Sequence, residues 1–257
     1  MVRIDVYLVS AGYAPSRSKA QQLIESGAVT VNGRMVKKSS EEVSEDGSSA
    51  VAVAESDATR YVSRGGLKLE AALTQFHIDV TGGVFADVGA STGGFTDCLL
   101  KHGAARVFCI DAGRDQLADV LRADSRVCVS EQTNARFLTA ADLIRLDGGV
   151  TRGFDGHVDG AVMDVSFISQ TLLFPMLSDV VRSGGVLISL IKPQFEVGRQ
   201  ALNKHGVVRR ESDRRLAVEK VNETAVASGF DVRGVIQSPI QGGDGNVEYV
   251  GYFVKRG

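Results

Sequence analysis

Short apolar segments alternate with helical segments along the chain from residue 66 onward. The segments expected as strands cover residues 84–88, 106–110, 127–129, 160–165, 186–191, 232–237 and 247–254. Helices are expected at residues 66–76, 95–101, 116–122, 169–181 and 212–228, with a glycine-rich surface loop at 147–160. Strands separated by helices form parallel sheets covered on both faces, so we predict an α/β fold. The last two strands lack an intervening helix, which predicts an antiparallel addition to the sheet.

The first 59 residues show a different pattern, which predicts a small α+β domain. The expected elements are helices at residues 3–11 and 16–25, a hairpin at 29–36 and a strand at 50–53. Pro15 and Ser16 suit the start of the second helix, and Asn32-Gly33 is a strong signal for a tight hairpin turn. Residues 55–60 are expected to be a linker. The predicted domains are residues 1–59 and residues 60–257.

Charge is unevenly distributed along the chain, although the formal net charge is only -2. Basic residues outnumber acidic ones up to residue 38, where only Asp5 and Glu25 oppose them. The basic residues of this part are Arg3, Arg17, Lys19, Arg34, Lys37 and Lys38. A basic module fits an anionic partner, although on charge alone a solvated surface is the simpler explanation.

Other features of the sequence narrow the function classes. The longest apolar run, residues 186–191, is far shorter than the roughly 20 residues of a membrane-spanning helix, and Asp5 stands where a secretory signal would be apolar. The three cysteines form no CxxC pair and have apolar neighbours, so we expect them to pack in the core. The four histidines lack metal-ligand spacing. We predict a cytoplasmic protein with no structural disulfide, no membrane partner and no catalytic metal.

A glycine-rich string between an expected strand and an expected helix is the strongest single motif. Its candidate ligand-binding residues are Asp87, Gly89, Ser91, Thr92, Gly93, Gly94 and Phe95. Glycines allow a tight turn and a close approach of the backbone to a ligand. The spacing matches neither GxGxxG nor a P-loop, which disfavours dinucleotide and triphosphate ligands. An acid at the strand end suits an amino-bearing ligand better than a pyrophosphate, and a purely structural turn is the alternative.

Two polar residues follow the next strands of the expected sheet. Asp111 ends the strand after the glycine-rich string, where an acidic side chain can accept hydrogen bonds from both hydroxyls of an adenosine ribose. Its alternative role is to cap the following helix. Asn134 comes after the third strand, where it is a candidate to line an adenine pocket.

Opposite charges stand at the ends of two further expected strands. Asp164 follows apolar residues 160–163, and Lys192 follows the apolar run that ends at Ile191. Ligands bind at the carboxyl ends of strands in open α/β sheets, and an unpaired buried charge is costly. The two residues therefore indicate either a functional site or a structural salt bridge. Lys68 and Glu248 could complete a cluster with them, although neither stands out by itself.

The whole chain resembles the TlyA family, bacterial proteins described as ribosomal RNA 2′-O-ribose methyltransferases and historically as hemolysins. The N-terminal part resembles an alpha-L RNA-binding module through residues 17–20, 23–24 and 31–33. The larger part is similar to FtsJ-type ribose methyltransferases. The matching strings are residues 62–69, 87–97, 164–169, 191–196 and 245–248. The loop at residues 147–160 departs from the family pattern, which leaves RNA contacts near it open.

The resemblance implies a Rossmann-like class I methyltransferase sheet and S-adenosylmethionine as methyl donor. It places the catalytic Lys-Asp-Lys-Glu tetrad of FtsJ-type enzymes on Lys68, Asp164, Lys192 and Glu248. Lys192 would orient the ribose hydroxyl or accept its proton, while Asp164 and Glu248 would hold the lysines in place. The implied partner is ribosomal RNA or a ribosomal subunit, with no obligate protein partner evident. The N-terminal module would bind its phosphates through Arg3, Arg17, Lys19 and Arg34.

Three other function classes stay open at this point. A membrane-damaging hemolysin finds no spanning segment or secretion signal in the sequence to support it. A small-molecule methyltransferase would leave the basic N-terminal module without a role. A non-catalytic RNA-binding assembly factor would leave the complete tetrad without a role.

Overall fold

The structure is a computed structural model that describes residues 1–14, 16–45, 47–54 and 60–257. The chain forms two compact units, Met1–Tyr61 and Val62–Gly257, and each is described by itself. Pro15, expected at the start of a helix, and residues 55–59 of the expected linker lie outside the described residues.

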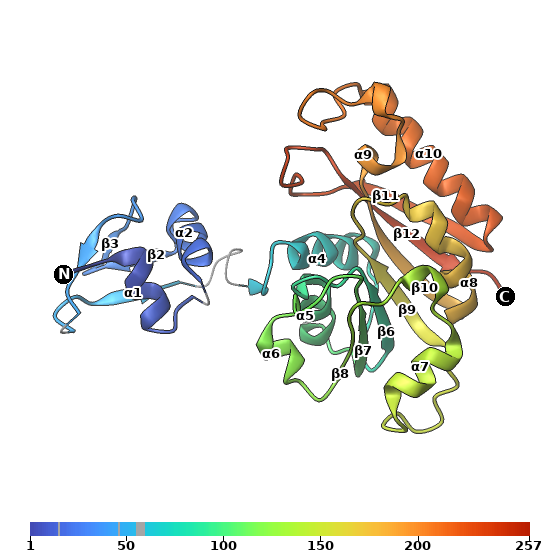
Figure 1. Cartoon of the computed structure of the whole chain (residues 1–257), viewed down its shortest axis with the longest axis horizontal. Coiled ribbons are helices and arrows are strands. Elements are labelled where there is room, and N and C mark those ends of the chain that lie inside the picture. Colours follow the sequence, from blue (N-terminus) through green and yellow to red (C-terminus); the bar gives the residue numbers. More distant parts are fainter. Residues whose placement is uncertain (15, 46, 55–59) are drawn as a thin grey trace. The chain divides into compact units, whose positions relative to one another are not determined.

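The first unit is a small α+β domain (Figure 1). Its elements are β1 (Val2–Arg3), α1 (Ile4–Ser10), α2 (Arg17–Glu25), β2 (Val29–Val31), β3 (Arg34–Met35), β4 (Glu42–Val43) and β5 (Val51–Val53). Strands β3, β2 and β5 form an antiparallel sheet, and β1 pairs with β4. Asn32 and Gly33 form the predicted turn with φ angles of 51° and 75°. Ser16 caps α2 by accepting a hydrogen bond from the backbone N–H of Lys19 at 3.3 Å.

The second unit is built on one seven-stranded sheet, in the order β11-β12-β10-β9-β6-β7-β8. The strands are β6 (Val84–Val88), β7 (Arg106–Ile110), β8 (Val127–Ser130), β9 (Val158–Met163), β10 (Val181–Ile191), β11 (Phe230–Gln237) and β12 (Tyr249–Lys255). Strands β10, β9, β6, β7 and β8 run parallel, and β12 is antiparallel to both of its neighbours. The predicted α/β fold and its antiparallel addition are therefore confirmed.

Helices lie on both faces of this sheet (Figure 1). They are α4 (Gly65–Phe76), α5 (Gly94–Lys101), α6 (Asp119–Arg122), α7 (Ala140–Asp147), α8 (Phe174–Val180), α9 (Pro193–Glu196) and α10 (Glu211–Ala227). Single turns of 3-10 helix are η1 (Ala135–Phe137), η2 (Gln170–Leu173) and η3 (Arg199–Ala201). Among the described residues, no helix is long and apolar enough to cross a membrane.

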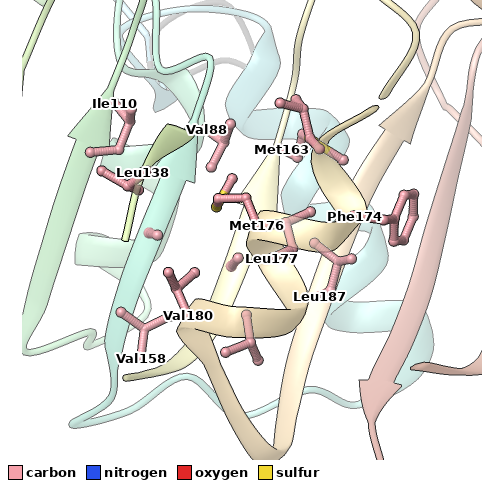
Figure 2. Packing of buried hydrophobic residues seen from close by; sticks show 14 of the residues in the cluster. Val88, Ile110, Leu138, Val158, Met163, Phe174, Met176, Leu177, Val180 and Leu187 are labelled. Carbon is pink, nitrogen blue, oxygen red and sulfur yellow. The ribbon is translucent and has the colours of Figure 1, made fainter. Parts of the chain in front are cut away.

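The main core lies between the sheet and its helices. Figure 2 shows Met176, Leu177 and Val180 of α8 packed among side chains of the strands, including Met163 and Leu187. Side chains of a strand alternate between the two faces, so a strand covered on both sides is apolar throughout. Polar side chains therefore gather where the strands end. Because β6, β7, β9 and β10 are parallel, their carboxyl ends share one edge of the sheet.

One expected helix is shorter than predicted because a distant carboxylate holds its first residues in a turn. The prediction placed a helix at residues 116–122, but α6 covers only Asp119–Arg122. The Glu131 carboxylate accepts hydrogen bonds from the backbone N–H groups of Asp115, Gln116 and Leu117 at 2.9 to 3.2 Å. Burial acts to raise the pKa of Glu131, but these bonds and the one from Arg122 together outweigh it and lower the pKa from the ordinary 4.5 to about 2.

Two other helices differ from the prediction. The expected helix at residues 169–181 consists of η2 followed by α8, and β10 already begins at Val181. Helix α7 has no counterpart in the prediction. It begins with a capping box in which Thr139 and Asp142 accept hydrogen bonds from each other's backbone N–H groups.

Candidate active site

The glycine-rich string forms the turn between β6 and α5. Gly89 has a φ of +82°, and a Cβ atom there would lie 2.5 Å from the carbonyl oxygen of Asp164. Gly93 has a φ of +92°, and a Cβ there would lie 2.7 Å from Leu117 Cδ1. Both positions combine a left-handed backbone with no room for a side chain, which only glycine tolerates. The turn therefore passes close to the end of β9, where Asp164 begins the next loop.

Asp111 lies at the end of β7 and binds the glycine-rich turn directly. Its Oδ2 atom accepts a hydrogen bond from the backbone N–H of Ser91 at 2.7 Å, and its Oδ1 atom accepts one from Gly113 at 2.7 Å. Each carboxylate oxygen has two lone pairs, so one on each atom is left for a ligand hydroxyl. Asp111 is half-buried and lines a cavity, so a ligand in that cavity can reach its carboxylate.

Two adjoining cavities open at this edge of the sheet. The first has a volume of about 390 Å³, and its lining includes Ile110, Asp111, Asn134 and Phe167. The second has a volume of about 230 Å³ and is lined by Thr92, Gly94 and Phe95 of the turn and by Arg64, Lys68 and Gln241. Both cavities touch Gly89, Ser91 and Asp164. The structure thus brings most of the predicted donor-binding residues to one continuous hollow.

Two predicted donor-binding residues, Gly93 and Asp87, line neither cavity. Asp87 lies beneath the turn. Its side chain is completely buried, and its Oδ2 atom accepts a hydrogen bond from Thr96 Oγ1 at 2.6 Å. Its Oδ1 atom has no hydrogen-bond partner among the described residues. Burial raises the pKa of Asp87 to about 7, although the Thr96 bond opposes this rise, and the nearby carboxylates of Asp164 and Asp111 add to it.

Asp164 and Lys192 form an ion pair at the ends of β9 and β10. Lys192 Nζ lies 2.7 Å from Asp164 Oδ1 and donates a hydrogen bond to Ser166 Oγ at 2.7 Å. Asp164 Oδ1 has no partner with hydrogen-bond geometry among the described residues, so its contact with Lys192 is mainly electrostatic. The side chains are 13% and 25% exposed for Lys192 and Asp164. Asp164 lines both cavities, while most of each side chain of the pair is shielded from water.

Lys68 and Glu248 form a second ion pair on the same side of the sheet. Lys68 comes from α4, and Glu248 immediately precedes β12. Lys68 Nζ lies 2.5 Å from Glu248 Oε2, and the side chains are only 11% and 3% exposed. Lys68 and Asp164 line the same cavity, and each forms an ion pair with a tetrad residue that lines neither cavity, Glu248 and Lys192 respectively.

A buried network that the sequence analysis missed supports the loop after Asp164. Glu196, in α9, accepts hydrogen bonds from Ser169 Oγ at 2.5 Å and from the backbone N–H of Gln170 at 2.8 Å. Lys220 of α10 pairs with the same carboxylate at 3.2 Å. Glu196 therefore connects the loop that begins at Asp164 to the helix that follows Lys192. The signals in the sequence were its place four residues after Lys192 and at the end of the family-matching string 191–196.

The predicted RNA-binding cations of the first unit are all engaged in contacts within it. Arg3 and Arg17 both pair with Asp5, at 3.0 and 2.9 Å, and the hydrogen bonds that they donate, with their positive charge, lower the pKa of this fully buried carboxyl. Lys19 donates to the carbonyl of Tyr61 at 3.3 Å, and Arg34 pairs with Glu41 at 2.7 Å. Arg3, Arg17 and Arg34 nevertheless keep side chains that are 45%, 57% and 72% exposed, so their remaining N–H groups face solvent.

The chain matches two protein families over separate ranges. Residues 61–255 match the family described as FtsJ-like methyltransferase, and residues 2–47 match the S4 domain. The 16S/23S rRNA (cytidine-2′-O)-methyltransferase TlyA of Mycobacterium tuberculosis strain H37Rv is 41% identical over 96% of this chain and 87% of the relative. Hemolysin A of Brachyspira hyodysenteriae is 37% identical over 98% of this chain and 100% of the relative.

Solved structures show the same similarity at the level of the fold. A hemolysin-type protein from Streptococcus thermophilus superimposes with a TM-score of 0.74 and 39% identity, over 99% of this chain and 88% of that chain. Fibrillarin of Aeropyrum pernix, solved with bound S-adenosyl-L-methionine, has a TM-score of 0.50 at 16% identity, over 88% of this chain and 94% of that chain. At that identity the second comparison concerns the fold alone.

Proposed function

Because this chain belongs to the FtsJ-like methyltransferases and, among them, to the TlyA proteins, we propose that it transfers a methyl group from S-adenosylmethionine to a ribose 2′-hydroxyl of ribosomal RNA. The observation that carries the proposal is the meeting of two lysine–carboxylate ion pairs at one cavity wall. The pairs are Lys68–Glu248 and Asp164–Lys192, beside the glycine-rich turn.

The residues present fit the methyl donor. S-adenosylmethionine joins a nucleoside to an amino acid, and the hollow consists of two adjoining parts of about 390 and 230 Å³. We assign the nucleoside to the larger part, where Asp111 would accept hydrogen bonds from the ribose hydroxyls and Asn134 would line the base. We assign the amino acid to the smaller part, next to Gly94 and Phe95. When bound, the donor supplies a sulfonium-activated methyl group.

The chain's own residues would then position the acceptor. A ribose hydroxyl is a weak nucleophile unless its oxygen is aligned with the methyl group and a nearby group accepts its proton. Lys192, which pairs with the cavity-lining Asp164, would orient the 2′-oxygen or receive its proton. Asp164 balances the charge of Lys192, and Glu248 does the same for Lys68, so neither lysine is left as an isolated charge in a shielded site. Glu196 would hold the loop after Asp164 in a fixed position relative to Lys192.

The S4-type first unit would bind the RNA partner. Exposed N–H groups of Arg3, Arg17 and Arg34, with Lys19 near them, would contact phosphates and so position the substrate without reading its sequence. The substrate would be ribosomal RNA or a ribosomal subunit, and the site of action the cytoplasm, where ribosomes lie. Since the M. tuberculosis relative bears cytidine in its name, we expect a cytidine as the target nucleotide.

The direct test is transfer of labelled methyl groups from S-adenosylmethionine to ribosomal subunits, and separately to their deproteinised RNA. Digestion to nucleosides and mass spectrometry should then find the label on ribose, in 2′-O-methylcytidine. Label on a base, or no RNA-dependent transfer, would contradict the proposal. Turnover with small acceptors alone would instead identify a small-molecule methyltransferase. Incubation of the same preparation with dye-filled liposomes tests membrane damage, for which we expect no leakage.

A further inference from the structure

The segment between α9 and α10, together with the first residues of α10, carries a concentration of positive charge that the proposed mechanism does not use. Residues 197–215 contain Arg199, Lys204, Arg209, Arg210, Arg214 and Arg215, against the two acids Glu211 and Asp213. We call residues 199–210 the basic hairpin. It is the loop before α10, drawn in orange in Figure 1.

The basic hairpin is an ordered element, held by its own hydrogen bonds. Leu202 and Val208 form an antiparallel bridge, and the backbone N–H of Asn203 donates to the carbonyl of Val207 at 3.1 Å. The side-chain oxygen of Asn203 accepts hydrogen bonds from the backbone N–H groups of His205 and Val207, at 2.8 and 3.0 Å. The exposed cations of the hairpin are therefore carried on a defined backbone.

One buried side chain connects the basic hairpin to the active site. Asn246 is 1% exposed and lies two residues before Glu248. Its Oδ1 atom accepts a hydrogen bond from the backbone N–H of Val208 at 3.0 Å, and its Nδ2 group donates to the carbonyl of Gly206 at 3.1 Å. The same loop lines the smaller cavity through Gln241. The hairpin is thus bonded to the loop that precedes β12 and contains Glu248.

The start of the basic hairpin follows Lys192 closely in the chain. Lys192 immediately precedes α9 (Pro193–Glu196), and η3 (Arg199–Ala201) is the first turn of the hairpin. The hairpin therefore lies between the segments that hold two of the tetrad residues, Lys192 and Glu248. An RNA whose ribose reached Lys192 would have its neighbouring phosphates near this surface.

The cations of the basic hairpin are available to a partner. Arg199, Lys204, Arg209 and Arg210 are exposed, and none of them forms an ion pair with any of the described residues. Exposed, unpaired cations on an ordered loop bind phosphates by releasing counterions, and such contacts position a nucleic acid rather than read its sequence.

We propose that the basic hairpin binds the phosphate backbone of the RNA beside the target ribose, so that the catalytic unit holds its substrate through a surface of its own. This inference rests on the proposed function for the identity of the nucleic acid. It adds a contact site separate from the S4-type unit.

The test compares two double variants of the full chain. Lys204→Gln/Arg209→Gln removes two cations of the hairpin. Arg182→Gln/Arg233→Gln is the control, because both residues are exposed and lie near the amino ends of β10 and β11, at the opposite edge of the sheet. Each pairs there with a surface carboxylate, Asp159 at 2.8 Å and Asp231 at 3.3 Å. Binding of fluorescein-labelled ribosomal RNA fragments is measured by anisotropy without methyl donor, over a range of salt concentrations, and donor binding is measured by calorimetry.

We expect the hairpin variant to bind RNA about tenfold more weakly near physiological salt, with a slope of log K against log salt reduced by about 1.4 to 1.8. The control and the donor affinity should stay within twofold of the wild type. Equal weakening in both variants, or an unchanged slope in the hairpin variant, would overturn the inference. Because this readout needs no methyl transfer, it is independent of whether the proposed reaction is correct.

Discussion

Lys68 and Glu248 are 180 residues apart in the chain, yet their Nζ and Oε2 atoms lie 2.5 Å apart in a nearly dry environment. Removing only one member of such a pair lowers the folding stability strongly, because the remaining charge stays buried without a partner. It adds little stability over a well-packed apolar pair of similar size. A buried ion pair of this kind at a cavity wall is therefore better explained by function than by stability.

The first prediction separates these two roles. Lys68→Met should lower the free energy of unfolding by about 3 to 5 kcal/mol, because Glu248 loses its partner. The double variant Lys68→Met/Glu248→Leu should recover most of that stability and still lack methyl transfer. Urea unfolding and transfer assays measure the two effects. A double variant that is both stable and active would remove this pair from the chemistry.

The second prediction concerns Lys192. Lys192→Ala should abolish methyl transfer while donor binding stays nearly intact, because Lys192 lines neither cavity yet pairs with Asp164 at the wall where they meet. Its loss should therefore appear in turnover rather than in donor affinity. Single-turnover kinetics and calorimetry measure the two quantities.

Lys192→Arg is the informative control for this position. Arginine keeps the positive charge and could orient the hydroxyl, but it stays protonated in proteins. Complete loss of turnover with arginine would favour proton acceptance by Lys192, and substantial activity would favour orientation. Near-normal turnover with alanine would refute the ribose mechanism and favour methylation of a base.

The third prediction concerns the donor site. Asp111→Ala should weaken binding of S-adenosylmethionine by about 1 to 3 kcal/mol, the scale for losing hydrogen bonds to a charged group. Asp111 also holds the backbone of Ser91 and Gly113, so Asp111→Asn, which keeps an acceptor oxygen, should lose less. Calorimetry measures both affinities. Unchanged affinity in the alanine variant would exclude Asp111 from the donor site.

The fourth prediction follows from the raised pKa of Asp87. The folded-state pKa is about 7 against an ordinary 3.8, so the native state holds a proton that the unfolded chain has already released between these values. The contribution of this proton to the free energy of unfolding is fully present below about pH 4 and is lost as the pH rises through about 7.

Without donor, the wild type should therefore lose about 2 kcal/mol more stability than Asp87→Asn between pH 5 and pH 7.5. Asparagine is nearly isosteric and can still accept the bond from Thr96, so the difference isolates the titration. Urea unfolding at both pH values provides the measurement. Parallel pH profiles for the two proteins would show that Asp87 is ionised throughout.

The fifth prediction concerns the two units. A fragment of residues 62–257 should fold, because this unit has its own core, and should bind the donor like the full chain. Its affinity for ribosomal RNA should fall by at least about tenfold, since the phosphate contacts of the first unit are lost. The remaining binding should stay salt-sensitive through the basic hairpin. Equal RNA affinity of fragment and full chain would show that the first unit is not an RNA clamp.

The sequence by itself determined the elements of the fold and the strand ends that carry polar groups. Alternating apolar strands and helices predicted the parallel sheet, and the glycine-rich string predicted the turn where Gly89 passes against Asp164. Asp111, Asp164 and Lys192 were found because each polar residue interrupts an apolar run. These signals are local, since periodicity and glycine geometry act over a few residues.

Only the tertiary structure decided which of these residues meet. The pairing of Lys68 with Glu248 depends on docking α4 beside β12, and no local pattern encodes a contact between such distant segments. The shortening of α6 depends on Glu131, and the bonds of Asn246 to the basic hairpin join two separate loops. Asp87 was expected to contact the ligand but is buried beneath the turn. How far a residue at a strand end is buried depends on the elements packed around it. Long-range packing and hydrogen bonding set these positions, and local patterns of residues along the chain do not reveal them.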